Sequence, residues 1–71
     1  MFDNIDSPEV DIICKYITST DKALLIEADG EQVWIPISQI NDLSVELSEL
    51  ERGDPLTITI PEWLAEDKEL I

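Results

Sequence analysis

The sequence predicts one small, mainly β domain: a five-stranded antiparallel barrel of SH3-like or OB-like type, closed by a short C-terminal α-helix. Short runs of β-branched and apolar residues recur along the chain, turn-forming residues separate them, and the clearest helical spacing is found near the end. A chain of 71 residues lies near the lower size limit for a domain with one core. Hydrophobic residues make up 44% of it, which is enough for such a core.

The first strand is predicted over residues 9 to 18, where β-branched side chains and Tyr16 are concentrated. Residues 1 to 8 are polar and without periodicity, so they are interpreted as a flexible lead-in, and residues 9 to 71 as the single barrel domain. Residues 18 to 21 are rich in Ser and Thr and predict a turn.

A hairpin is predicted next, because Asp29-Gly30 separates two apolar runs and both positions of such a turn favour positive φ. Its strands cover residues 22 to 28 and 31 to 37. Pro36 cannot donate to a strand ladder, so this end of the second strand is expected to lie at a sheet edge or to leave the sheet there.

The middle of the chain allows two interpretations. Residues 38 to 40 predict a tight turn or one helical turn. Leu43, Val45 and Leu47 then alternate with polar residues, which favours a strand, whereas the spacing of Leu43, Leu47 and Leu50 also fits a helix. The poor helix formers Ser44, Val45 and Ser48 favour the strand.

The last two elements carry the clearest signals. After a turn at residues 51 to 54, Leu56, Ile58 and Ile60 alternate with threonines, which predicts a strand opened by Pro55. Pro61 is then expected at the first position of a helix of two to three turns, which extends to about residue 70.

Catalytic and metal-binding chemistry is poorly represented in this sequence. There is no histidine, and the single Cys14 lies in an apolar run, which is typical of a buried small side chain. Gly30 and Gly53 both lie in turns, so no phosphate-binding loop is expected. We therefore expect a protein that is not an enzyme and that has no cofactor and no metal site.

The charge is the most informative property for function. Seventeen acidic residues against four basic ones give a net charge of −13, which repels nucleic acid and membranes and attracts basic protein surfaces. The acidic residues that we expect to bind a partner form a group before the last strand and a group on the helix: Glu46, Glu49, Glu51, Asp54, Glu62, Glu66, Asp67 and Glu69. In a folded barrel the two groups could merge into one negative face, or the charge could serve solubility alone.

The tryptophans also allow two interpretations. Trp63 is expected to hold the helix against the barrel, and Trp34 to cover the other end of the core. Alternatively, one of them is an exposed anchor for a partner, and Trp34 is the candidate because it lies opposite the inward residues of its strand.

Two motifs resemble small, uncharacterised, acidic proteins encoded by bacteriophages and prophages. They are Trp-Ile-Pro-x-Ser-Gln-Ile at residues 34 to 40 and Pro-Glu-Trp-Leu-Ala at residues 61 to 65, and the resemblance covers residues 22 to 71. In those proteins the variable position is often basic, whereas this chain has Ile37. The resemblance implies a phage origin and hence the cytoplasm of a host cell, where the acidic N-terminus also places the chain because it is unlike a signal peptide.

Two functions follow as hypotheses. The protein imitates nucleic acid and blocks a basic nucleic-acid-binding host protein, as an anti-CRISPR or anti-restriction inhibitor does. Alternatively, it is an accessory protein-binding module of a phage replication or recombination complex, which docks through a strand edge or Trp34. Either could be a homodimer paired through an edge strand, and neither is expected to bind nucleic acid directly.

Overall fold

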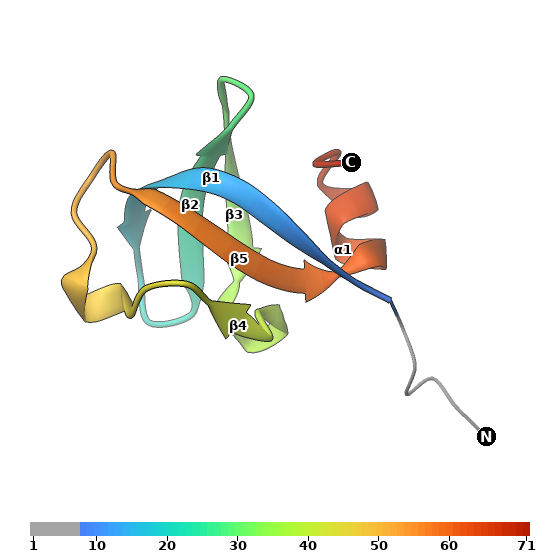
Figure 1. Cartoon of the computed structure of the whole chain (residues 1–71), viewed down its shortest axis with the longest axis horizontal. Coiled ribbons are helices and arrows are strands. Elements are labelled where there is room, and N and C mark those ends of the chain that lie inside the picture. Colours follow the sequence, from blue (N-terminus) through green and yellow to red (C-terminus); the bar gives the residue numbers. More distant parts are fainter. Residues whose placement is uncertain (1–7) are drawn as a thin grey trace.

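The computed structural model describes residues 8–71, in which five antiparallel strands form one sheet in the order β3-β2-β1-β5-β4 (Figure 1). Of the predicted lead-in, residues 1–7 lie outside the described residues. The elements are β1 (Glu9–Ser19), β2 (Ala23–Ala28), β3 (Glu31–Pro36), η1 (Ile37–Gln39), β4 (Asp42–Leu43), η2 (Leu47–Glu49), β5 (Pro55–Pro61) and α1 (Glu62–Asp67).

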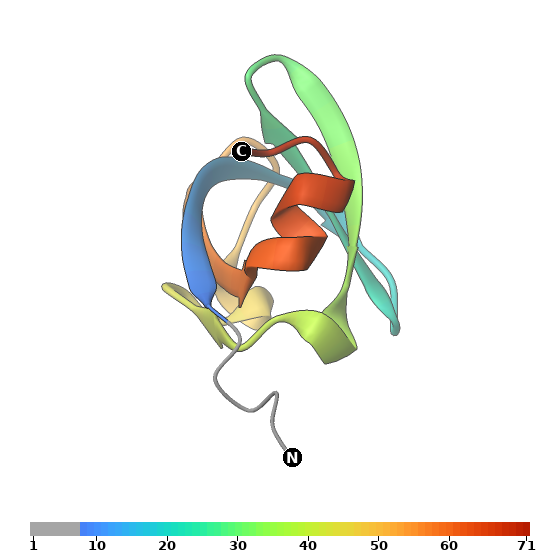
Figure 2. The ribbon, with the colours of Figure 1, turned by 90° about the vertical axis from the view of Figure 1, so that its right-hand side faces the viewer.

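The long strand β1 joins the two halves of the sheet. Its first part pairs with β5, from Glu9 opposite Pro61 to Lys15 opposite Pro55, and its second part pairs with β2. An irregularity between Tyr16 and Thr18 lies in the second part, where an extra residue increases strand twist. Figure 2 shows the result: the sheet curves, and its two halves lie on either side of α1.

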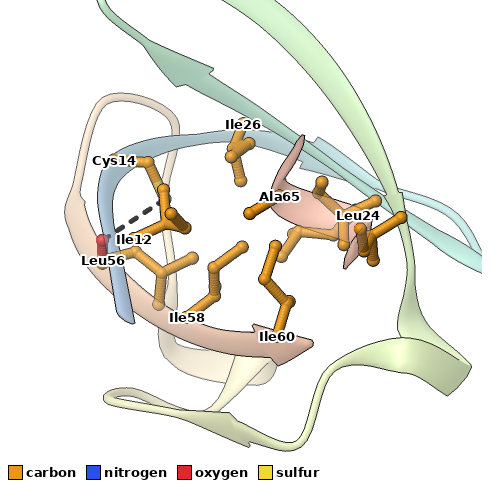
Figure 3. Packing of buried hydrophobic residues seen from close by; sticks show 10 residues of the cluster. Ile12, Cys14, Leu24, Ile26, Leu56, Ile58, Ile60 and Ala65 are labelled. Carbon is orange, nitrogen blue, oxygen red and sulfur yellow. Dashed lines mark hydrogen bonds between the residues drawn. The ribbon is translucent and has the colours of Figure 1, made fainter. Parts of the chain in front are cut away.

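The core fills the concave side of this curved sheet (Figure 3). Alternate residues of each strand point inward, as the two-residue period of a strand requires. The most deeply buried ones come from β1, β2, β3, β5 and α1: Ile12, Cys14, Leu24, Ile26, Ile35, Leu56, Ile58, Ile60, Leu64 and Ala65. Each fully buried leucine or isoleucine contributes about 1.5–3 kcal/mol, so this compact set carries most of the stability.

The hairpin between β2 and β3 forms as the sequence predicts. Asp29 has φ 53° and Gly30 has φ 82°, the paired positive values of a two-residue hairpin turn. All six residues of β2 pair with β3 in register, from Ala28 opposite Glu31 to Ala23 opposite Pro36. The expectation that Pro36 ends an edge strand is also confirmed.

The segment from residue 43 to residue 50 is neither the strand nor the helix that its spacing suggests. The strand β4 has two residues, and the 3-10 turn η2 follows. At Ser44 the side-chain Oγ, rather than a backbone carbonyl, accepts the N–H of Thr57 at 3.0 Å, which ends the ladder. The leucines of this segment pack against the edge of the core, and this packing explains the mixed periodicity.

The helix α1 is shorter than predicted. Pro61 is its N-cap with extended backbone rather than its first helical residue, and the helix ends at Asp67. The N–H of Leu70 donates to the carbonyl of Ala65 at 2.7 Å, and that of Glu69 to Glu66 at 3.0 Å. This is a Schellman C-cap, with Glu69 in the left-handed position at φ 60°.

Replacing Glu69 by glycine is expected to stabilise the protein by about 1 kcal/mol, because glycine adopts a left-handed φ without the steric cost of a Cβ. For a domain of this size the melting temperature should rise by about 4–8 °C. Glu69→Gln is the matched control, since it removes the charge and keeps the strained φ. Equal melting temperatures for the two variants would contradict the prediction.

The predicted class, a mainly β domain of five antiparallel strands with a C-terminal helix, is confirmed. Within residues 8–71, β3 and β4 are the two ends of the sheet, and no backbone pairing joins them. Closure into a barrel therefore stays a prediction.

Candidate acidic interaction surface

The first predicted group of acidic residues lies in the segment between β4 and β5. Glu46, Glu49 and Glu51 are exposed there. Asp54 is half-buried and has a structural task, because its Oδ2 accepts the backbone N–H of Glu51 at 2.9 Å. The same turn is attached to β1 by the Gly53 N–H, which donates to the Tyr16 carbonyl at 2.7 Å.

The second predicted group lies on α1 and its cap. Glu66, Asp67 and Glu69 are exposed, whereas Glu62 is half-buried and its N–H donates to the Pro8 carbonyl at 2.9 Å. Lys68 lies among these carboxylates and offsets part of their charge.

The structure does not bring the two groups together. The first ends immediately before β5 and the second begins immediately after it. Seven residues of strand span about 23 Å. The two groups therefore lie at opposite ends of β5, as Figure 1 shows.

A third set of carboxylates, which the sequence interpretation missed, lies between them on the outer face of the sheet. Asp11 on β1 and Asp42 on β4 are both paired with Thr59 on β5, so all three side chains lie on one face. Glu9 lies on the same face as Asp11, two residues along β1. We call Glu9, Asp11 and Asp42 the acidic face.

Neighbouring side chains hold two of these carboxylates in place. The Thr59 hydroxyl donates to Asp11 Oδ1 at 2.7 Å, and the Asn41 amide donates to Glu9 Oε2. Strand spacing separates Asp11 from Asp42 by about 10 Å, close to the Debye length at 0.1 M salt. Their fields therefore overlap at low salt. The alternation of acidic and apolar residues from Glu9 to Ile12 was the signal for this face.

The tryptophans differ from the first interpretation of them. Trp63 is 53% exposed, and α1 is instead held to the core by Leu64 and Ala65. Trp34 is 45% exposed on the outer side of β3, where its cross-strand partner Leu25 is half-buried. Trp34 is therefore partly accessible to a partner, as the interpretation of this residue as an exposed anchor requires.

A shallow cavity of about 340 Å³ lies between β1 and the hairpin of β2 and β3. Ile13, which is 81% exposed, and Lys15 line it from β1, and Glu27 and Asp29 from the hairpin. None of the predicted site residues lines it. Its lining is mainly apolar, and the cavity is wide open to solvent.

Cys14 is buried, and its thiol donates to the Leu56 carbonyl at 3.3 Å. Burial raises the pKa of this thiol from 9.0 to about 11. The pKa of Cys14 is higher in the folded than in the unfolded chain. The contribution of the protonated thiol to the free energy of unfolding is therefore complete below pH 9, and it is lost as the pH rises through 11.

We therefore expect a disulfide reagent at pH 8 to label folded Cys14 about a hundredfold more slowly than the urea-unfolded chain. The absorbance of the released reagent measures both rates. Equal rates would contradict the burial of a neutral thiol.

Among residues 8–71, no three Cys, Asp or Glu side chains gather in the arrangement that a metal ion needs. In the same part of the chain, no helix has the length and apolar character to cross a membrane.

The function of this chain has to be inferred from its own residues. No protein-family model, no curated protein and no solved structure matches this chain.

Proposed function

We propose that this protein is an acidic inhibitor that imitates nucleic acid and occupies the basic surface of a nucleic-acid-binding protein. The resemblance to phage proteins points to a host defence complex, such as a restriction or CRISPR effector, as the target. The observation that carries the proposal is the acidic face, which displays three carboxylates, two of them held by hydrogen bonds, on one side of the sheet between two further acidic groups.

The acidic face favours binding over a purely solubilising role for two reasons. A carboxylate held by a hydrogen bond loses less conformational freedom when it meets a partner, so its binding is weakened less by ordering. The strands β1 and β5, which carry Glu9, Asp11 and Thr59, are also anchored by the core below them. Charges meant only for solubility do not need fixed positions.

The dimensions also suit a short stretch of nucleic acid. The acidic groups follow β5 over about 23 Å, from the turn before it to the helix after it. Duplex DNA carries one charge per about 1.7 Å, so the protein presents fewer charges than a duplex of that length. Hydrogen bonds and apolar contacts must supply the rest of the affinity.

The test is retention of proteins from a host-cell lysate on the immobilised protein at low and at high salt. We expect a nucleic-acid-binding protein to be retained at 50 mM salt, released at high salt, and displaced by duplex DNA. A retained protein that resists both salt and DNA would contradict mimicry, as would the absence of any retained nucleic-acid-binding protein.

A further inference from the structure

The outer edge of β3 is an unpaired strand edge that faces away from the sheet. Within residues 8–71, β3 is the last strand on its side of the sheet, and its only strand partner is β2. Pairing with β2 is regular along all six residues of β3, with no bulge. The edge is therefore straight enough to accept a further strand.

The register shows which backbone groups are free on this edge. The Ile37 N–H donates to the Lys22 carbonyl at 2.9 Å, so residues 22 and 37 form a hydrogen-bonded pair. In an antiparallel ladder such pairs recur at every second residue, so Glu31, Val33 and Ile35 also bond to β2. The N–H groups of Gln32 and Trp34 consequently point outward, together with the carbonyls of Gln32, Trp34 and Pro36.

The usual protections of a strand edge are scarce on β3. Natural edges are protected by lysine, proline, bulges or short length. This strand has six residues, contains no lysine, and has its proline only at the last position. Beside the free amide of Trp34, the indole is 45% exposed and supplies an apolar anchor.

The surrounding charge identifies the chemistry of the occupant. Glu27 and Glu31 lie on β2 and β3, and Asp29 lies in the turn between them, which makes this end of the edge acidic. An exposed indole also attracts Lys and Arg side chains through its ring face. A second copy of this chain is disfavoured, because two chains of net charge −13 repel each other.

We propose that the edge of β3 binds an extended, basic segment of a partner protein, which adds to the sheet as a sixth strand. The backbone of Gln32 and Trp34 pairs with that segment, Trp34 contacts its apolar side chains, and the acidic hairpin contacts its Lys or Arg residues. This interface is separate from the acidic face, and it goes beyond the proposed mimicry because it recognises an extended backbone.

The test uses a synthetic peptide of six alternating Lys and Val residues with blocked ends. Hydrogen exchange is measured by NMR at each amide of the folded chain. We expect exchange at Gln32 and Trp34 to slow at least tenfold when the peptide is present. Exchange at Val33 and Ile35 should change little, since both are already bonded to β2. The same peptide with every amide N-methylated, and a Glu-Val peptide, should have no effect.

A matched pair of variants tests the free N–H directly. Gln32→Pro removes this donor, which the β2 ladder does not use, whereas Gln32→Val removes only the side chain. We expect Gln32→Pro to weaken peptide binding about tenfold and Gln32→Val to preserve it. Fluorescence of Trp34 in a Trp63→Phe background measures both affinities. The peptide controls on the unaltered chain keep the test decisive if Gln32→Pro does not fold.

Several results would overturn the proposal. One is unchanged exchange at Gln32 and Trp34 with millimolar peptide, and another is equal binding of the N-methylated peptide. If exchange at these amides were already slow in the free protein and became slower at higher protein concentration, a second copy would be shown to occupy the edge. Neutralising Glu9, Asp11 and Asp42 should leave peptide pairing intact, so failure of this proposal and failure of mimicry can be distinguished.

Discussion

Replacing Ile58 by alanine is expected to remove most of the folding free energy of this protein. Ile58 is completely buried at the centre of β5, where it pairs with Ile12 on β1 and Leu43 on β4. Cutting a buried isoleucine to alanine costs about 2–5 kcal/mol. A single core in a chain this small supplies about 3–5 kcal/mol in total. Urea denaturation followed by circular dichroism measures the loss.

Ile13→Ala is the matched control, because it makes the same chemical change on the neighbouring strand at a side chain that is 81% exposed. We expect its free energy of unfolding to change by less than about 0.5 kcal/mol. If the two variants lost similar stability, the assignment of inward and outward faces in β1 and β5 would be wrong.

The second large effect concerns binding to a basic partner. The triple variant Glu9→Gln, Asp11→Asn and Asp42→Asn should weaken that complex on the order of 10- to 100-fold at low salt, because it removes the fixed charges of the acidic face. The loss should shrink as salt is added, since screening already weakens these contacts in the parent protein. Calorimetry with the partner recovered from lysate measures the loss of affinity at low salt and at high salt.

A hairpin variant distinguishes position from net charge. Glu27→Gln, Asp29→Asn and Glu31→Gln change the net charge by the same three units at a different place. We expect this variant to weaken the complex only slightly, through long-range attraction. Equal losses in both triple variants would show that the acidic face is not the site that determines binding, and that bulk charge or the hairpin does so.

The sequence alone predicted an element correctly where one local signal dominated. The Asp29-Gly30 turn and the alternation along β5 each have a single physical cause, and both elements formed with nearly the predicted bounds. The segment around Val45 has no such signal. Its leucines each pack separately against the core. The hydrogen bonds between Ser44 and Thr57 determine where the pairing of β4 with β5 ends. Those contacts depend on tertiary structure.

The candidate site was predictable only in its chemistry. The net charge indicated a basic partner, but nearness in sequence was a poor guide to the site. The two groups of acidic residues that it defines lie at opposite ends of β5 in the structure. The acidic face joins Asp11 to Asp42, which are far apart in the chain and meet only through Thr59. The sequence contained the alternation of β1, but it did not contain the register that brings β1 beside β5.

The central position of β1 also determines how the chain folds. The hairpin of β2 and β3 closes a loop of two residues and can form within about 1–10 μs. Strand β1, in contrast, must find β5 across the 35 residues from 20 to 54 before the core is enclosed. Such distant pairing slows folding toward the millisecond-to-second range. Until then, β1 has one apolar face and one open edge, so this strand is where aggregation during refolding should begin.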